Sequence, residues 1–263
     1  MKLVGDIKHI IIIESLLVNE RLTGREMYDD CIKRLIDFHQ KPFTHKYHSV
    51  NSKNQLTELL KYYQINASYL NGGLLLHFEM HGANNLTGLV LSDGSLINWK
   101  ELIELFRPIN IIICNKLFIT MATCYGRHLY KGVELYQKSP YSGYISASTA
   151  IYPSEIVDKY SILFEKLIEC GNLVEAYLEM KKSESNFYYK DSKRTFEESY
   201  KFTFDSLTQN KEYKGKFIEE SKKQAQQMGQ PIPDVEMSEF IFQKALRDIY
   251  EKQKEAFDFK DCE

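Results

Sequence analysis

The chain has 263 residues, of which 43% are hydrophobic and 27% are charged, and its formal net charge is −2. This length can bury one sizeable core with an appended module, and the composition is that of an ordinary globular protein. The near balance of charge argues against broad affinity for nucleic-acid phosphates or for anionic membranes.

Apolar runs and cysteine usage narrow the class further. The longest apolar runs, such as 109–114, fall well short of the ~20 residues that a membrane-spanning helix needs. The amino terminus shows no secretory cleavage pattern. The five cysteines include no C-x-x-C pair and no histidine at metal-ligand spacing, which argues against a disulfide scaffold and a zinc site. We therefore expect a cytoplasmic protein that binds no nucleic acid, membrane, metal or other cofactor.

Strand-like and helix-like segments alternate through residue 182. Strand patterns cover 7–18, 45–50, 73–80, 117–123 and 141–147, and helical patterns cover 22–38, 55–63, 125–136, 154–170 and 173–182. Such alternation is typical of an α/β domain, in which a mostly parallel sheet lies between two layers of helices. We predict a three-layer α/β/α sandwich over residues 1–182.

The remaining segment, 183–263, has a different character, with aromatic residues spaced among lysines and glutamates. The patterns over 199–227 and 238–259 predict two longer helices, separated by Gly229-Gln-Pro-Ile-Pro233. We predict a helical C-terminal extension. It either covers one face of the sandwich or offers a regulatory surface to a partner protein or a small signalling molecule.

Two reactive side chains follow buried strands. His81-Gly82 comes directly after the apolar run 74–80, and Cys124-Tyr125-Gly126 comes directly after the run 117–123. If these strands are parallel neighbours, the imidazole and the thiol meet at the carboxyl edge of the sheet. That arrangement is a cysteine nucleophile with its base.

The surroundings of Cys124 fit this chemistry. A thiol is mostly protonated near neutral pH unless a histidine or a helix amino terminus favours the thiolate, and the helix predicted over 125–136 begins beside the sulfur. Backbone N–H groups of Gly82 and Cys124 are candidate donors to an oxyanion, and Gly126 would ease the turn from strand to helix.

A simpler interpretation competes with this one. A single cysteine at a strand end is usually a small core residue, and a single histidine is usually a satisfied polar group. We assign that structural role to Cys31, Cys114 and Cys170, which lie among apolar neighbours in helical or strand patterns. The paired context of His81 and Cys124 favours function for those two.

The order of these elements resembles the caspase-like cysteine peptidases, the group of caspases, metacaspases, separases and bacterial CHAT-type peptidases. The likeness covers residues 7–182. It includes the His followed by a small residue, a hairpin-like segment over 88–99 similar to the CHAT-type branch, and the strand ending Ala122-Thr-Cys-Tyr-Gly126. The interval of 43 residues between His81 and Cys124 is close to the ~50 seen in caspases.

The resemblance implies a caspase-like fold and a set of roles. Cys124 would be the nucleophile, His81 the general base and later acid, and the amides of Gly82 and Cys124 the oxyanion site. The reaction would be cleavage of a protein or peptide substrate through a thioester acyl-enzyme.

The sequence also departs from the caspases. Their Gln-Ala-Cys-Arg-Gly motif is absent, which favours the wider group. Caspases hold an acidic substrate side chain with two arginines. Arg21 or Arg25 stands near the first of these, whereas 144–152 contains none. Further candidates for substrate contacts are Ser146 and Ser148. If the substrate side chain is basic, as in some members of the group, Glu155 or Asp158 is a candidate.

Three functions therefore stay open. The first is a cysteine endopeptidase activated by a signal or a partner, as in bacterial relatives that serve in defence against phage. The second is a catalytically idle caspase-like binding or sensor module. The third is a doubly wound sheet that binds a phosphorylated ligand. Such sheets hold the phosphate in a glycine-bearing loop after an early strand. We rank this function last, because the corresponding turn over 18–24 has only one glycine and carries an acidic residue.

Overall fold

The computed structural model describes residues 4–209 and 211–260. Within them the chain forms two compact units. The first unit comprises residues 4–133, 139–193 and 259–260, and the second comprises 134–138 and 194–258.

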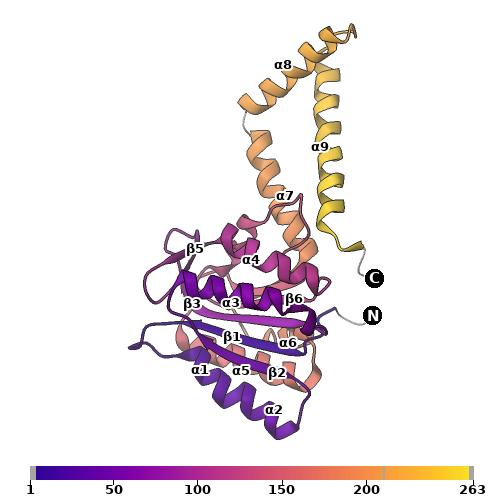
Figure 1. The fold of residues 1–263 in the computed structure, drawn as a ribbon. Helices are drawn as coiled ribbons and strands as arrows, with labels where there is room; N and C mark the ends of the chain where they lie inside the picture. Colours follow the sequence, from indigo (N-terminus) through magenta and orange to yellow (C-terminus); the bar gives the residue numbers. More distant parts are fainter. Residues whose placement is uncertain (1–3, 210, 261–263) are drawn as a thin grey trace. The chain divides into compact units, whose positions relative to one another are not determined.

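A mostly parallel sheet forms the centre of the first unit (Figure 1). Its main strands are β1 (His9–Ser15), β2 (Thr44–Ser49), β3 (Leu74–Gly82), β6 (Leu117–Ala122), β7 (Gly143–Ala147) and β8 (Phe187–Asp191). They lie in the order β2-β1-β3-β6-β7-β8, and every neighbouring pair is parallel except β7 and β8. A hairpin of β4 (Gly88–Val90) and β5 (Leu96–Asn98) pairs with the carboxyl end of β3.

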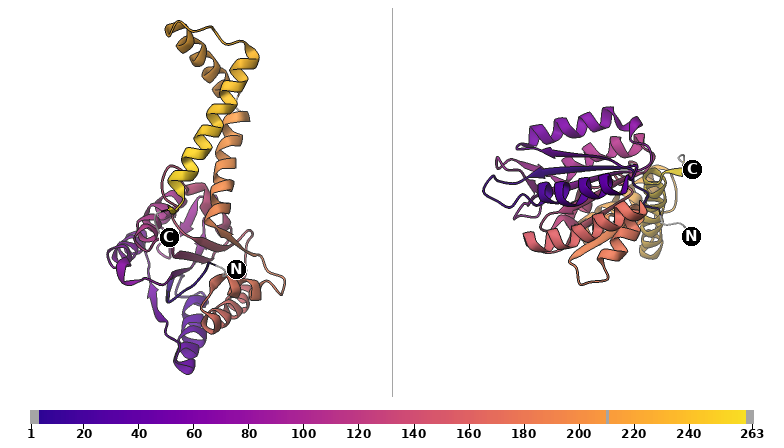
Figure 2. Two further views of the ribbon diagram at one scale, coloured as in Figure 1. Left: turned by 90° about the vertical axis from the view of Figure 1, so that its right-hand side faces the viewer. Right: turned by 90° about the horizontal axis from the view of Figure 1, so that it is seen from below.

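Helices cover both faces of this sheet (Figures 1 and 2). One face carries α3 (Lys53–Ile65) and α4 (Trp99–Ile112). The other face carries α1 (Thr23–Met27), the π-helix η1 (Tyr28–Lys33), α2 (Arg34–His39), α5 (Pro153–Cys170) and α6 (Leu173–Met180). The predicted three-layer α/β/α sandwich with a mostly parallel sheet is confirmed.

Alternation along each strand divides the core into two layers, because successive side chains point to opposite faces. In β3, Leu74, Leu76 and Phe78 pack toward α3 and α4, whereas Leu75 packs toward α5 and α6. The same period places His77 and Glu79 on the α5 side of the sheet. Both are almost fully buried there, so polar side chains lie near the carboxyl end of β3 within an otherwise apolar layer.

Two expected helices differ from the structure. The helix predicted over 125–136 is wrong: the segment forms only the 3₁₀ helix η3 (Gly126–Gly132). Tyr125 before it takes the left-handed conformation, with φ of 57°, and glycines at both ends of η3 are poor helix formers. Residues 187–191, expected within the helical extension, form β8 instead, because aromatic side chains such as Phe187 favour a half-buried strand.

The second unit is helical, with α8 (Lys211–Gln227), α9 (Val235–Phe257) and most of α7 (Ser192–Gln209). Aromatic rings hold it together: Tyr200 packs edge-on against Tyr250 at 4.8 Å between centroids, and Phe217 packs edge-on against Phe242 at 5.2 Å. In the described residues, none of the helices combines the length and apolar character needed to cross a membrane.

Candidate active site

The pairing of β3 with β6 determines where His81 and Cys124 lie. The two strands are parallel, and their last paired residues are Glu79 and Ala122. His81 and Cys124 each follow two positions later, so both belong to the same face of the sheet at its carboxyl end. Both side chains line one cavity of about 240 Å³.

This cavity has apolar walls and a few charged groups. Apolar surface comes from Leu16 in the loop after β1, from Ile151 in the loop before α5, and from Ile156 in the first turn of α5. Glu20 and Arg21 line it from the loop after β1, and Glu79 lines it from β3. A substrate side chain entering here would meet both apolar surface and charge beside the thiol.

A side-chain hydrogen bond and a glycine allow the ends of β3 and β6 to lie close together. The hydroxyl of Thr123 donates to the carbonyl oxygen of Met80 at 2.9 Å. A Cβ placed on Gly82 would lie 2.1 Å from the carbonyl oxygen of Cys124. Glycine therefore follows His81 for a steric reason: any side chain at position 82 would push the backbone of Cys124 away.

The thiol of Cys124 is partly exposed and contacts the backbone of Ile151. The N–H of Ile151 donates to Sγ at 3.5 Å, and Sγ lies 3.9 Å from the Ile151 carbonyl oxygen. Cys31 is buried, as the sequence predicts, and burial raises the pKa of its thiol to about 12. The same prediction is wrong for Cys114 and Cys170, which are exposed at the ends of their helices. Solvent and a reagent can reach the sulfur of Cys124 but not that of Cys31.

The imidazole of His81 contacts a carboxylate. Its Nε2 lies 2.9 Å from Oε1 of Glu20, and the side chains of His81 and Glu20 are 54% and 32% exposed. Burial acts to raise the pKa of Glu20, but the backbone N–H of Leu17 and the side chain of His81 outweigh it and hold that pKa below its ordinary value.

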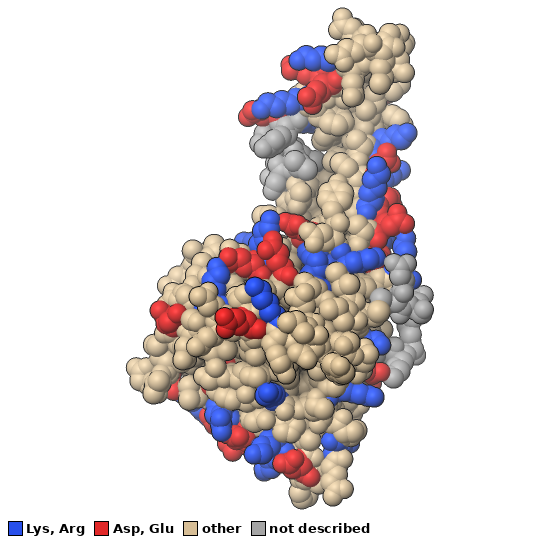
Figure 3. Space-filling view, in the orientation of Figure 1, with Lys and Arg blue, Asp and Glu red and all other residues tan. Residues whose placement is uncertain are grey.

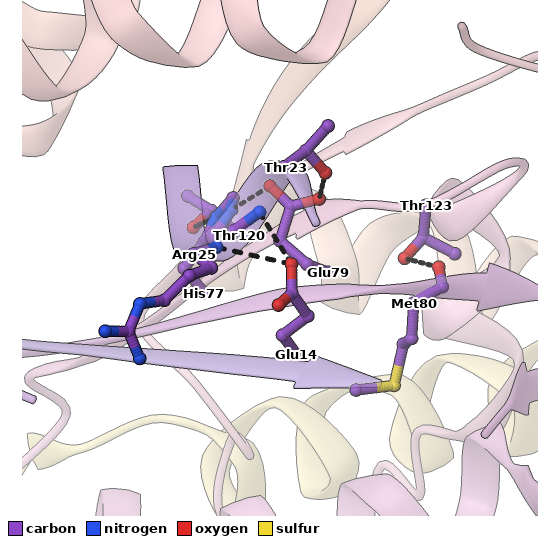
Figure 4. Close-up of polar contacts among 9 residues, drawn as sticks. Glu14, Thr23, Arg25, His77, Glu79, Met80, Thr120 and Thr123 are labelled. Carbon is purple, nitrogen blue, oxygen red and sulfur yellow. Dashed lines mark hydrogen bonds and ion pairs between the residues drawn. The ribbon is translucent and has the colours of Figure 1, made fainter. Parts of the chain in front are cut away.

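A buried polar network lies beside the cavity on the α5 side of the sheet (Figure 4). The ring of His77 bonds Glu79 at 2.8 Å through Nε2 and Thr120 at 2.7 Å through Nδ1. The other oxygen of Glu79 accepts from the hydroxyl of Thr23 at 2.9 Å. Each of these polar groups is paired, so the network fixes the strand ends that carry the site.

Glu14 forms the second half of this network. Its carboxylate accepts from the backbone N–H of Gly24 at 2.8 Å and from the hydroxyl of Tyr47 at 2.5 Å. It pairs in register with Glu79 on the neighbouring strand. Burial raises the pKa of Glu14, and the nearby charge of Glu79 adds to this, although the hydrogen bonds act the other way.

The other predicted site residues are spread around the cavity. Arg21 lines it, and its guanidinium pairs with Glu26 at 2.6 Å. Ser146 is buried in β7, and the N–H of Ser148 bonds the carbonyl of Asn186; neither lines the cavity. Asp158 lies exposed on α5, outside the cavity lining.

The turn after Cys124 differs from the expectation. Tyr125, not Gly126, takes the left-handed conformation, and its N–H bonds the carbonyl of Thr149 at 3.1 Å. Gly126 is needed for packing instead, since a Cβ there would lie 3.1 Å from that of Ser146. With η3 only seven residues long and of 3₁₀ type, the expected help of a helix amino terminus for the thiolate is removed.

The sequence interpretation missed Glu20 and Glu79. Glu79 precedes His81 by two residues in a run that is apolar except for His77, and a charged residue in such a run is a detectable signal. Glu20 gave no such signal, because an acidic residue in a loop is usually solvated.

On the face shown in Figure 3, acidic and basic residues are interspersed. No group of three or more His, Cys, Asp or Glu side chains in the described part of the chain is arranged to hold a metal ion.

Comparisons with known proteins give a likeness in structure but none in sequence. No protein-family model matches the sequence, and no curated protein matches it either. The structure is similar to the crystal structure of the Drosophila initiator caspase Dronc, with 11% sequence identity and a TM-score of 0.49. The match covers 72% of this chain and 82% of the Dronc chain. This likeness concerns the path of the backbone and not the reaction.

Proposed function

We propose that this chain is a cysteine endopeptidase of the caspase-like group, with Cys124 as nucleophile and His81 as general base. The observation that carries the proposal is the shared cavity: a partly exposed thiol and an imidazole line it from the carboxyl ends of neighbouring parallel strands. A nucleophile with a nearby base is the arrangement that acyl transfer requires.

The reaction follows from these groups. His81 accepts the proton of the Cys124 thiol, and the sulfur attacks the peptide carbonyl carbon. The proton then passes to the leaving amine as the C–N bond breaks, which leaves a thioester that water hydrolyses.

Gly82 is the proposed oxyanion donor. Ala83 donates to the carbonyl of Gly88, and alternate residues of an antiparallel pair form such bonds. The N–H of Gly82 is therefore turned away from β4, and we propose it as a donor to a developing oxyanion.

We also propose that a signal activates the enzyme. The sulfur of Cys124 contacts the backbone of Ile151, and no hydrogen bond joins it to His81 in the described structure. A partner protein or a small signalling molecule would have to shift the segment over 149–153. The CHAT-like sequence features support a cytoplasmic effector in defence against phage.

The test is cleavage of a peptide library derived from a proteome, with new termini identified by mass spectrometry. The purified full chain is assayed alone and with extracts of phage-infected cells as activator. Cys124→Ala should abolish cleavage, whereas Cys114→Ala, which removes an exposed thiol outside the cavity, should keep it. Cleavage that persists in the Cys124→Ala protein would overturn the proposal.

The contact between Cys124 and Ile151 also favours a second candidate, a catalytically idle binding or sensor module. The two functions differ in thiol reactivity. In an enzyme, iodoacetamide should label Cys124 faster than the exposed Cys114 in at least one activation state. Labelling of Cys124 no faster than Cys114 in every state would favour the idle module.

A further inference from the structure

Glu20 lies in a turn that fixes its carboxylate. The N–H of Glu20 donates to the carbonyl of Leu17 at 2.9 Å, and the N–H of Leu17 donates back to Oε2 of Glu20 at 2.8 Å. One carboxylate oxygen is thus held by the backbone of its own turn. The other, Oε1, is left to meet Nε2 of His81 at 2.9 Å.

This contact determines the tautomer of the histidine. A carboxylate can only accept, so Nε2 of His81 carries the hydrogen. In the neutral ring, Nδ1 is then the nitrogen with a free lone pair. It is therefore Nδ1 that takes the proton when the thiol of Cys124 ionises.

From this geometry we infer that Glu20 is a positioning residue for His81, the third member of a Cys124-His81-Glu20 triad; the inference rests on the proposed peptidase function. Glu20 orients the ring and its tautomer. It also stabilises the positive charge that the ring gains when the proton moves from Sγ to Nδ1.

The other charged groups around the cavity are already engaged. Arg21, from the same loop, pairs with Glu26, and Glu79, from β3, bonds His77 and Thr23. The first turn of α5 and the loop before it contribute Ile151, Pro153 and Ile156, none of which titrates. The carboxylate that bonds His81 is that of Glu20, so removing it should directly change the reactivity of His81 and Cys124.

The solvent exposure of His81 and Glu20 limits how much the loss of the Glu20 charge can change the reactivity of Cys124. His81 and Glu20 are 54% and 32% exposed, so water and salt screen their attraction. For Glu20→Gln we expect Cys124 to react with iodoacetamide about two- to fivefold more slowly at pH 7 in low salt. The pH midpoint of the reaction should move upward, because the thiolate–imidazolium pair has lost a stabilising charge. In 1 M NaCl the difference should shrink.

A matched control is Asp29→Asn. Asp29 is a 40% exposed carboxylate that pairs with Arg25 on the neighbouring helical segment and does not line the cavity. The Asp29→Asn substitution removes the same charge without changing a contact of His81, so the pH midpoint of Cys124 alkylation should stay unchanged. Glu20→Asp, which keeps the charge, should recover part of the wild-type rate.

A second readout is independent of reactivity. Nitrogen-15 NMR of the full chain, with the ring signals of His81 assigned by comparison with His81→Gln, should show the Nε2–H tautomer in the wild type. The Glu20→Ala protein should show a mixture of both tautomers. Equal spectra, or equal pH midpoints for Glu20→Gln and wild type, would overturn the inference.

The outcomes separate this inference from the proposed function. If Glu20→Gln and wild type cleave peptides equally well, the proposed peptidase function stands and the role of Glu20 is contradicted. If the chain cleaves no peptide but shows the tautomer and rate changes above, the role of Glu20 toward His81 stands and the peptidase function is contradicted.

Discussion

The hydroxyl of Thr123 donates to the carbonyl oxygen of Met80 at 2.9 Å, and both groups are buried. Thr123 immediately precedes Cys124, and Met80 immediately precedes His81. This hydrogen bond therefore joins the two strand ends just beyond their last paired residues and holds the proposed nucleophile near its proposed base.

Replacing Thr123 by valine should weaken this connection. The variant keeps the shape but leaves the Met80 carbonyl without its partner, so the free energy of unfolding should fall by about 1–3 kcal/mol. Alkylation of Cys124 should slow as well. Urea unfolding and the alkylation rate measure the two effects. Thr123→Ser retains the hydroxyl and should keep the alkylation rate close to that of the wild type; a valine variant as stable as the wild type would show that the bond contributes nothing.

Gly82→Ala should be more damaging. The added methyl group would lie 2.1 Å from the carbonyl oxygen of Cys124, and the neighbour is backbone, so the strand ends must separate. We expect a loss of about 1–3 kcal/mol in unfolding free energy and loss of peptide cleavage. Gly215→Ala is the control for the substitution itself. Position 215 lies in α8, and no atom lies near the added methyl group. Because alanine favours a helix more than glycine does, Gly215→Ala should raise the free energy of unfolding by up to about 1 kcal/mol. Equal behaviour of the two variants would contradict the steric argument.

The interval of 43 residues between the two proposed catalytic residues has a structural origin. It equals the register offset between β3 and β6, where Leu74 pairs with Leu117 and Glu79 pairs with Ala122. A reader of the sequence who recognises two buried parallel strands can therefore foresee that His81 and Cys124 reach the same level of the sheet. The strands and the sandwich could be predicted because buried parallel strands appear in the sequence as long apolar runs.

Other parts of the site depend on contacts that have no periodicity. Glu20 meets His81 across 61 residues because a turn at 17–20 happens to fix its carboxylate. The left-handed Tyr125 depends on a hydrogen bond to Thr149, far along the chain. Local propensity says little about such loops, so the contact of Glu20 with His81 and the short η3 became visible only in three dimensions.

Glu14 should make stability depend on pH. Its pKa is raised in the folded chain by burial, so the folded state holds the proton more strongly than the unfolded state. The contribution to stability is fully present below the ordinary carboxyl pKa and is lost as the pH rises through the raised value. Glu14→Gln removes this titration. Its unfolding free energy relative to the wild type should therefore improve as the pH is raised from 4 to 8, measured by urea unfolding at each pH. A constant difference across that range would contradict the assignment.

Phe242 should be essential to the helical second unit. Its side chain is 7% exposed and packs edge-on against Phe217 at 5.2 Å between ring centroids, which joins α9 to α8. Phe242→Ala should cost about 3 kcal/mol, because truncation of a buried phenylalanine removes both apolar burial and packing. Hydrogen exchange of the α8 and α9 amides should accelerate accordingly. Phe240, two residues earlier and 65% exposed, provides the control, since Phe240→Ala should change stability by no more than about 0.5 kcal/mol. Similar exchange rates in the two variants would mean that the contact between Phe217 and Phe242 does not hold these helices together.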